Sequence, residues 1–494
     1  MITCAEDYSA FKLIHEGILA LSRAEQAGIR VDVDYYQKTY KRLERDIAIL
    51  NTKFNSTELA HTWIKAYGSK VNFDSNDQLA KVLFNHMGIK AVKLTAKGNP
   101  STDEEALLAV GLPDVAAIIK TRQLSKLKET YIGGFLREQV DGYVHCFFNL
   151  HNVVSFRSSC DKINFQNQYN RDPVLKNLCR TGVLPHPGQL LLCADFKGAE
   201  VCGAACYNKD PNLISYLKDP SLDMHRDVAV DCLLTTPDQI IKSVRNIFKG
   251  GFTFAQFYGD WYKSCAENMW GQIQATQPTL KNGILVLQHL ATKGIKTYQH
   301  FEDQVQKVED IFWNKRFKVY KKWKEDWFRE YCDNGFFTTL TGFTCTGEMD
   351  RKQAVNYPIQ GTSFHLLLMS LIILDRMIIK RGWKSRIIAQ IHDELVISVE
   401  PSEAMEIIKA INWIVSVELP RIFPWINVPL IIEMEATPIN GSWNHKVDLC
   451  SCGGIADMDT SQKGEFIMYC PYCMKETVSC ESYEQALKTW KEVR

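Results

Sequence analysis

The chain has 494 residues, 46% of them apolar and 23% charged, which is typical of a globular protein with more than one domain. The formal net charge of +1 excludes a strongly basic or acidic protein, so a site for a polyanion has to come from local clusters of charge. No basic segment followed by an apolar core opens the sequence, and the most apolar stretch, residues 364–379, is interrupted by His365, Asp375 and Arg376. We therefore expect no signal peptide, no membrane contact, a buried helix at 364–379, and a cytoplasmic protein with reduced thiols.

The N-terminal part of the chain is predicted to be helical. Apolar residues recur at helical spacing through residues 8–60 and predict two long helices that pair with each other. Further helices are expected near 103–110 and 113–136, and strands follow at 143–150 and 190–195.

A mostly helical segment then separates two strand-rich parts of the chain. It covers residues 205–350, and a core helix at 358–380 and a hairpin come after it. The pattern predicts an α+β fold. Its β platform, formed by residues 141–204 and 351–445, is interrupted by the helical segment and preceded by a helical domain at 1–140.

Acidic residues stand at the ends of two predicted strands that are far apart in the sequence. Apolar runs on both sides of His392, Asp393 and Glu394 predict a hairpin with acids at its tip, and Asp195 ends an apolar run that begins at Leu190. Charged residues are also common in ordinary solvated turns. Two aspartates on facing strands can, however, hold two magnesium ions about 3.5–4 Å apart for an in-line phosphoryl transfer. We therefore expect a two-metal site at Asp195 and Asp393.

Two cations and two aromatic residues follow one another at helical spacing. Arg245 and Lys249 are four residues apart, as are Phe254 and Tyr258, so the members of each pair lie on one face of a helix. Two fixed cations followed by two rings suit a nucleoside triphosphate, with the cations on the phosphates and the rings against sugar and base. The same spacing also fits an amphipathic helix with two surface cations.

A basic run from Lys315 to Lys324 is interleaved with Phe317, Tyr320 and Trp323. Such a run is found on surfaces that bind nucleic acid. It is also typical of a solvated helix face that covers an aromatic core stripe, and we favour this second interpretation.

Four segments in order resemble the polymerase motifs of family A DNA polymerases, the DNA polymerase I class, in a shortened form similar to that of bacteriophages. The segments are 195–200, 245–259, 356–361 and 392–394, and the resemblance covers about residues 10–445. It implies a right-hand fold in which the thumb is 1–140, the palm is 141–204 and 351–445, and the fingers are 205–350. It also implies template-directed extension of a DNA primer with dNTPs.

The resemblance assigns roles to residues around the two aspartates. Asp195, Asp393 and the carbonyl of Phe196 would bind two Mg²⁺ ions, and Glu394 would lie beside them. The ions would lower the pKa of the primer 3′-hydroxyl and stabilise the pyrophosphate leaving group.

The nucleotide site is implied by the same resemblance. Arg245, Lys249 and His225 would hold the triphosphate, and Lys249 would be the general acid for pyrophosphate. Glu200, together with the ring of Phe254, would exclude a ribose 2′-hydroxyl.

Contacts with DNA are implied for a third group of residues. Tyr258 would stack near the templating base. Primer–template contacts would come from Arg157, Asn164, Gln166, Asn167, Asn356, Gln360 and His392. Hydrogen bonds of this kind check duplex geometry in the minor groove without reading sequence.

Two spacings depart from the family pattern. One extra residue lies between Lys249 and Phe254, and on a regular helix one residue rotates the face by about 100°. We predict that Gly250 and Gly251 accommodate a single-residue π-type bulge or a local kink that returns Phe254 to the side of the cations. The segment that begins at Arg157 is one residue shorter than usual.

The family's proofreading exonuclease normally precedes the thumb and needs its own metal-binding acids. Residues 11–32 already resemble the thumb helix. We therefore expect no 3′–5′ exonuclease on this chain.

Cysteine pairs near the C-terminus predict a structural zinc site. The ligands would be Cys450, Cys452, Cys470 and Cys473, because two such pairs about eighteen residues apart fit a four-thiolate ribbon better than free thiols. His445 and Cys480 are further candidates. Residues 446–494 resemble small zinc ribbons of the restriction-alleviation type found in phages and end in a short amphipathic helix. Because a module this short has little hydrophobic core of its own, removal of zinc should unfold it locally.

The expected partners are primer–template DNA, dNTPs and replisome proteins, and the expected state is a monomer in the cytoplasm, that of the host if a phage encodes the chain. Two other functions are a single-subunit RNA polymerase and a catalytically inactive, nucleic-acid-binding replisome protein. Glu200 and Glu394 favour DNA synthesis over RNA synthesis. The metal-binding acids and the triphosphate cations favour an active enzyme.

Overall fold

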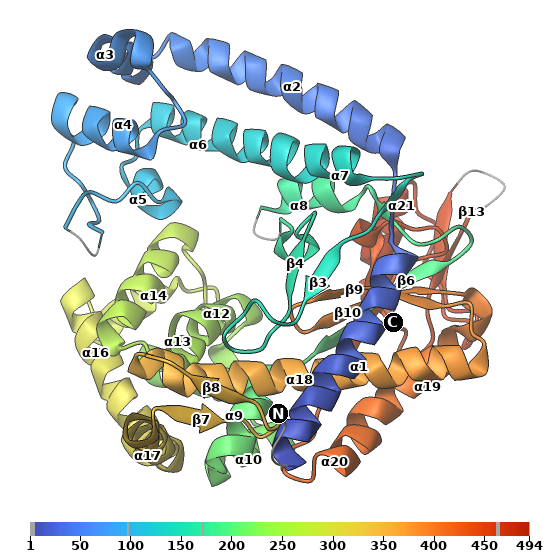
Figure 1. Cartoon of the computed structure of the whole chain (residues 1–494). Coiled ribbons are helices and arrows are strands. Elements are labelled where there is room, and N and C mark those ends of the chain that lie inside the picture. The colour runs from blue at the N-terminus through green and yellow to red at the C-terminus, as the bar shows by residue number, and fades with distance from the viewer. Residues whose placement is uncertain (1–4, 96–97, 170–171, 461–464, 494) are drawn as a thin grey trace.

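The computed structural model of the protein describes residues 5–95, 98–169, 172–460 and 465–493 (Figure 1). At its centre lies a five-stranded sheet in the order β12-β11-β6-β10-β9, in which all neighbours are antiparallel. The strands are β6 (Leu190–Phe196), β9 (Arg386–Ile391), β10 (Glu394–Val399), β11 (Ile432–Ala436) and β12 (Val447–Asp448). The expected platform of two chain segments is confirmed, because β6 precedes the helical segment and the other four strands follow it.

The longest helix, α18 (Arg351–Arg381), crosses the molecule below the sheet (Figure 1). It begins seven residues before the predicted start, because Asp350 and Gln353 form a capping box and Pro358 lies inside the helix. Of the helices in the described parts of the chain, α18 alone is long and apolar enough to cross a membrane, yet 72% of its apolar window is buried inside the protein. The predicted buried core helix is thus confirmed.

The two long N-terminal helices are present, but their predicted pairing is wrong. The first helix, α1 (Ala5–Ala27), packs against α18 and β9, whereas α2 (Val33–Asn55) packs against α6 (Pro113–Lys126). Between them, β1 (Ile29–Val31) pairs with β2 (Tyr143–Val144) and β5 (Val183–Leu184). This small sheet redirects the chain, so α2 leads away from α1 (Figure 1).

The far end of α2 belongs to a separate helical unit with its own core. Trp63, Leu79 and Val115 are fully buried in this core. Its helices are α3 (Glu58–Tyr67), α4 (Asn76–Ala80), α5 (Glu104–Ala109) and the start of α6. The chain returns to the sheet through a π segment (Leu127–Ile132), α7 (Gly133–Glu138), the hairpin of β3 (Phe147–Asn149) and β4 (Ser159–Asp161), and α8 (Pro173–Arg180).

The predicted helical segment follows β6. Its helices are α9 (Ala199–Asn208), α10 (Pro211–Lys218), α11 (Met224–Leu233), α12 (Lys242–Phe248), α13 (Ala255–Phe257), α14 (Tyr262–Thr276), α15 (Val286–Thr292), α16 (Tyr298–Ile311) and α17 (Lys318–Asn334). A short hairpin of β7 (Phe336–Thr338) and β8 (Thr344–Thr346) leads to α18.

The basic run at the start of α17 has the character of a helix face over an aromatic core. Phe317 and Tyr320 are buried, whereas Lys315 and Lys318 are exposed. The ammonium group of Lys324 turns inward and lies 4.2 Å from the centroid of the Trp313 ring. The interpretation that we favoured from the sequence is confirmed.

The C-terminal residues form a small module beside the sheet. Helices α19 (Ala404–Trp413) and α20 (Leu419–Ile422) follow β10, and β12 then leads into the hairpin of β13 (Asp457–Thr460) and β14 (Phe466–Tyr469) and into α21 (Tyr483–Val493). Met468 and Trp490 are fully buried in a separate core. Just before this module, Trp443 stacks on Phe165 with 5.3 Å between ring centroids. The guanidinium of Arg180 lies 4.0 Å from the centroid of the Trp443 ring.

Candidate active site

The sheet brings the two predicted metal-binding aspartates to the same end. Strands β9 and β10 are joined by a turn of two residues, His392 and Asp393, and His392 has a left-handed φ of 51°. The backbone N–H of Phe196, at the end of β6, donates a hydrogen bond of 3.0 Å to the carbonyl oxygen of Asp393. Asp195 is the one exposed residue of β6. The predicted hairpin is confirmed, and its turn lies against the end of the strand that carries Asp195.

Carboxylates crowd around Asp195. Glu394 on β10 and Glu433 on β11 stand directly opposite it in the register of the sheet, and like charges in this position repel each other. Lys446 lies 3.1 Å from Glu394, and Lys197 lies 2.8 Å from Glu433. Each flanking glutamate is therefore paired with a lysine, and Lys446 also lies 2.8 Å from Glu435. Asp195 has no such cation within 4.0 Å among the residues that the structure describes.

The surroundings of both aspartates disfavour their charged forms. Partial burial, together with the nearby carboxylates of Glu394 and Asp393, raises the pKa of Asp195 to about 7. Burial also raises the pKa of Asp393, although Arg157 opposes the shift, and Oδ1 of Asp393 has no hydrogen-bond partner in the described chain. Two neighbouring carboxylates, one of them with an unused acceptor, fit magnesium, which takes few protein ligands and keeps positions for water and phosphate oxygens.

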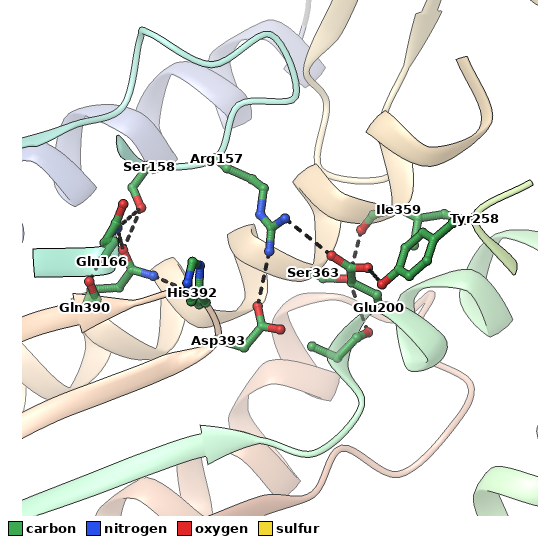
Figure 2. Close-up of polar contacts among 11 residues, drawn as sticks. Arg157, Ser158, Gln166, Glu200, Tyr258, Ile359, Ser363, Gln390, His392 and Asp393 are labelled. Atoms are coloured by element: carbon green, nitrogen blue, oxygen red, sulfur yellow. Dashed lines mark hydrogen bonds and ion pairs between the residues drawn. The ribbon is translucent and has the colours of Figure 1, made fainter. Parts of the chain in front are cut away.

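An arginine spans the space between the aspartates and the helix α9. The guanidinium of Arg157 lies 3.4 Å from Oε1 of Glu200 and 3.8 Å from Oδ1 of Asp393 (Figure 2). The hydroxyl of Tyr258 donates a hydrogen bond to the other carboxylate oxygen of Glu200. The hydroxyl of Ser363 on α18 lies 3.1 Å from the carbonyl oxygen of Ala199 and 2.8 Å from that of Ile359, and so links the start of α9 to α18. These contacts place Glu200 beside the predicted metal site.

The predicted bulge in the helix of cations and rings is confirmed. Residues Lys249–Phe254 form a π-helix between α12 and α13. The ammonium group of Lys249 lies 5.3 Å from the centroid of the Phe254 ring, and the ring of His225 is also 5.3 Å from it. The π segment absorbs the extra residue, so the ring lies on the side of the cations.

These cations line a cavity of about 640 Å³ next to β6. Arg245, Lys249, His225 and Phe254 all contribute to its wall. Arg245 forms a 2.5 Å ion pair with Asp223, the N-cap residue of α11. Burial and the charge of Arg245 lower the pKa of Lys249, and burial with the same cations lowers the pKa of His225 to about 4. The mutual repulsion of these cations favours an anion in the cavity.

A second group of predicted residues lines a groove on the other side of the hairpin. Gln166, Asn167 and His392 form one wall of this groove of about 950 Å³, and Gln123 and Lys126 of α6 lie across from them. Asn164 is exposed just before the short helix Phe165–Asn167. The groove thus gathers amide side chains, Lys126 and the carboxylates of Glu104 and Asp172 from distant parts of the chain.

Asn356 and Gln360 on α18 lie elsewhere. They line a small pocket together with Glu200, Phe254 and Tyr258. The amide of Asn356 donates a hydrogen bond of 2.9 Å to the carbonyl oxygen of Tyr258. In this structure the two residues therefore border the aromatic side of the site rather than the groove.

Residues that the sequence analysis missed fix the hairpin turn. Gln166 donates hydrogen bonds to Ser158 (2.8 Å) and to Gln390 (2.7 Å), and the amide of Gln390 donates to the carbonyl oxygen of His392 at 2.5 Å (Figure 2). Gln390 is a single polar residue in the apolar run 387–391, and this signal could have identified it. Lys446 had no such signal, because its partners Glu394 and Glu435 lie on two other strands.

The four predicted cysteines form one cluster at the C-terminal module. The Sγ atoms of Cys450, Cys452, Cys470 and Cys473 all lie within 4.8 Å of one another, and the closest pairs are 3.5 Å apart. Tetrahedral Zn–S bonds of about 2.3 Å give S–S distances of about 3.8 Å, so the cluster has the dimensions of a zinc site. A Cβ on Gly454 would lie 3.0 Å from Sγ of Cys470, so a glycine is needed there. Cys480 and His445 lie outside the cluster.

Comparison with known proteins identifies the family. A family model described as DNA polymerase family A matches residues 41–444. The chain belongs to DNA polymerase family A. Enzymes of family A use divalent metal ions for catalysis, which agrees with the crowded carboxylates around Asp195.

Individual relatives support this assignment to family A. The chain is 27% identical over 396 residues to the DNA polymerase of Bacillus phage SP01, covering 74% of this chain and 40% of the relative. It is 26% identical over 433 residues to DNA polymerase I of Bacillus subtilis (strain 168), covering 86% of this chain and 44% of the relative. The chain therefore spans less than half the length of either relative.

A solved structure shows the same fold. The POL domain of Pol1 from M. smegmatis, in complex with DNA primer-template and dNTP, superposes with a TM-score of 0.69 at 22% identity and covers 87% of this chain and 70% of that one. The α+β fold of this family A chain is thus that of the family's polymerase domain.

Proposed function

We propose that the chain is a template-directed DNA polymerase that extends a DNA primer with dNTPs by two-metal-ion nucleotidyl transfer. The observation that carries this proposal is the convergence of Asp195 and Asp393 at one end of the sheet, beside a cavity lined by Arg245 and Lys249. Acids that hold metal ions next to cations that hold phosphates are the two parts that a phosphoryl transfer needs.

The metal site is proposed to consist of Asp195, Asp393 and the carbonyl of Phe196, which would hold two Mg²⁺ ions. When bound, the ions supply a lower pKa for the primer 3′-hydroxyl and charge stabilisation for the pyrophosphate. The protein contributes the fixed spacing of the two aspartates, because the Phe196–Asp393 hydrogen bond locks the hairpin turn onto β6. Lys446 holds Glu394 by an ion pair at 3.1 Å, so this glutamate lies beside the site with a cationic partner in place.

The cavity next to β6 is proposed to bind the triphosphate. Arg245 and Lys249 would contact phosphate oxygens, and His225 would donate a further hydrogen bond. The pKa of Lys249 is lowered by burial and by Arg245, so its ammonium group gives up a proton more readily, as a general acid for the leaving pyrophosphate must.

Sugar selection is proposed to depend on Glu200. Arg157 and Tyr258 hold its carboxylate beside the site, where, with the ring of Phe254, it would meet a ribose 2′-hydroxyl. A carboxylate that two partners hold in place leaves no room for a further oxygen atom, and this favours dNTPs over rNTPs. Tyr258 is proposed to stack near the templating base.

The groove of about 950 Å³ is proposed to take the primer–template duplex. Gln166, Asn167 and His392 on its wall, and the exposed Asn164 nearby, would donate hydrogen bonds to the minor groove and backbone. Arg157, Asn356 and Gln360 would act nearer the primer terminus. Such contacts position a duplex without reading its sequence.

The division of the chain into a thumb (1–140), a palm (141–204 and 351–445) and fingers (205–350) remains our proposal. The packing of α1 against α18 and β9 gives the first helix contacts with the palm. We also propose that the cluster of four cysteines binds structural zinc and that the protein acts as a monomer, with other replisome proteins as further partners.

Primer extension tests the proposed function. The wild-type chain should extend a DNA primer with dNTPs and Mg²⁺ and should use rNTPs poorly. Asp195→Asn and Asp393→Asn should abolish extension but spare duplex binding in a fluorescence anisotropy assay, and Asp333→Asn, at an exposed aspartate on α17, should change neither. A clear preference for rNTPs would show an RNA polymerase instead. Duplex binding without any extension by the wild type would show an inactive binding protein.

A further inference from the structure

The residue that precedes Arg157 has an unusual backbone conformation. Phe156 has a φ of 57°, in the left-handed region that bulky residues rarely adopt. Its N–H donates a hydrogen bond of 2.9 Å to the carbonyl oxygen of Val153, so the loop 153–157 turns sharply just before the arginine. A backbone of this kind persists only where surrounding structure enforces it.

A buried histidine on α18 holds this turn. Nε2 of His365 lies 3.2 Å from the carbonyl oxygen of Phe156, and Nδ1 lies 2.6 Å from the hydroxyl of Thr341. A carbonyl oxygen only accepts, so Nε2 carries the proton. Because burial lowers the pKa of His365 to about 3, the ring is neutral, and Nδ1 accepts from Thr341. Both ring nitrogens are thus committed to holding the loop.

Aromatic packing fixes the histidine ring in this orientation. The ring stacks on Phe343 with 4.1 Å between centroids, and Phe343 packs in turn against the ring of Phe156 at 4.8 Å. His365 itself is fully buried. The ring of Phe156 therefore contacts Phe343, and its carbonyl oxygen accepts from His365, which is stacked on Phe343.

A glycine one turn earlier on α18 brings the loop close enough. A Cβ on Gly361 would lie 2.4 Å from the carbonyl oxygen of Ser155, a distance that backbone cannot accommodate without moving. Only glycine allows the loop to lie directly on the helix at this point. The loop thus touches α18 at two places one helical turn apart, and Arg157 leaves it towards Glu200 and Asp393 (Figure 2).

We propose that His365 and Gly361 are positioning residues that hold the loop 153–157 in its left-handed turn and so aim Arg157 into the active site. Neither residue touches the acids or the cavities described above. If Phe156 relaxed to a negative φ, the backbone direction at Arg157 would change, and its guanidinium would leave the gap between Glu200 and Asp393. This inference rests on the proposed function, because it assigns the effect to Arg157.

A double-mutant cycle tests the inference. His365→Leu removes both hydrogen bonds, and His365→Gln keeps an N–H at about the reach of Nε2. We expect His365→Leu and Arg157→Ala each to lower kcat/KM for dNTP by about 10- to 100-fold. The double variant should be no worse than Arg157→Ala alone. His365→Gln should recover most of the loss. Ser370→Ala, at a buried hydroxyl further along α18 that bonds only within the helix, should match the wild type.

The outcomes separate the two proposals. No extension by the folded wild type overturns the proposed function itself. If the wild type extends primers but the losses from His365→Leu and Arg157→Ala multiply, the histidine acts independently of Arg157 and the inference is wrong. Gly361→Ala provides a second variant should His365→Leu unfold, which a thermal melt reports. The effects of His365→Leu and Arg157→Ala on primer–template affinity are likewise expected not to add in the double variant.

Discussion

The π segment in the helix that carries Arg245, Lys249 and Phe254 makes a prediction about chain length. Deletion of Gly250 should convert the π segment into a regular helix and leave Lys249 and Phe254 four residues apart, on one face. Insertion of one alanine between Gly250 and Gly251 should instead separate them by a further residue. Gly250 is the position to delete because a Cβ there meets nothing within 4 Å, whereas a Cβ on Gly251 would lie 2.5 Å from Cγ of Met269.

The size of the effect follows from helix geometry. One residue rotates a helix by about 100° on a cylinder with a radius of about 2.3 Å, so the insertion displaces the Cα of Phe254 by about 3.5 Å around the axis. The ring then loses its positions 5.3 Å from Lys249 and from His225. Since a misplacement of about 1 Å can cost about 100-fold, the insertion should lower kcat/KM for dNTP by at least about 100-fold. The deletion should stay within about tenfold of the wild type, which corresponds to about 1.4 kcal/mol.

Single-turnover primer extension at varied dNTP concentration measures both variants, and circular dichroism confirms that they are folded. Gly250→Ala keeps the chain length and fills open space, so it should behave as the wild type does. Equal losses of kcat/KM in the deletion and the insertion would refute the reasoning. Any change in chain length would then be harmful, whether or not it kept Phe254 on the side of Lys249.

Three further predictions concern the sugar gate, the zinc module and a buried lysine. Glu200→Ala should raise the use of rNTPs relative to dNTPs by about tenfold or more, and an unchanged ratio in competition assays would contradict the proposed gate. Chelation of zinc should make residues 446–494 sensitive to protease and change the fluorescence of Trp490, while the rest of the chain keeps its melting transition; resistance to protease after metal loss would show that the small core suffices. Burial lowers the pKa of Lys324 to about 7, below the value of about 10.4 in the unfolded chain. The unfolded state therefore binds more protons between these values, so the free energy of unfolding should rise by about 2–3 kcal/mol from pH 7 to pH 9. Lys324→Met should remove that rise in urea titrations, and an equal rise in both proteins would assign it to other groups.

The local motifs could be predicted from the sequence because their chemistry depends on short spacings. The turn at His392 and Asp393, the end of β6 at Asp195 and the bulge before Phe254 follow from alternation, strand ends and a count of residues. The cysteine cluster follows from the spacing of two pairs of thiols in the same way.

Long-range packing could not be predicted in this way. The apolar spacing of the first helix does not specify which helix it packs against, and a three-residue strand, β1, separates it from α2. The partners of Arg157 and Lys446 lie on other strands and helices, so no local pattern identified them. The left-handed turn at Phe156 depends on His365, which the sequence shows only as an interruption in an apolar helix.

The charges of the site explain how it can be stable before any ligand binds. Arg157 spans Glu200 and Asp393, and Arg245 holds Asp223, so these two cations are paired with acids of the protein itself. On the proposed function, magnesium at Asp393 would take over the charge that Arg157 now balances, and a triphosphate would replace Asp223 as the partner of Arg245. Lys249 has no carboxylate within 4.0 Å among the described residues, so its ammonium group can meet an incoming phosphate without first leaving an ion pair. For Arg157 and Arg245, exchange of one ionic partner for another keeps each guanidinium paired both before and after the ligand binds.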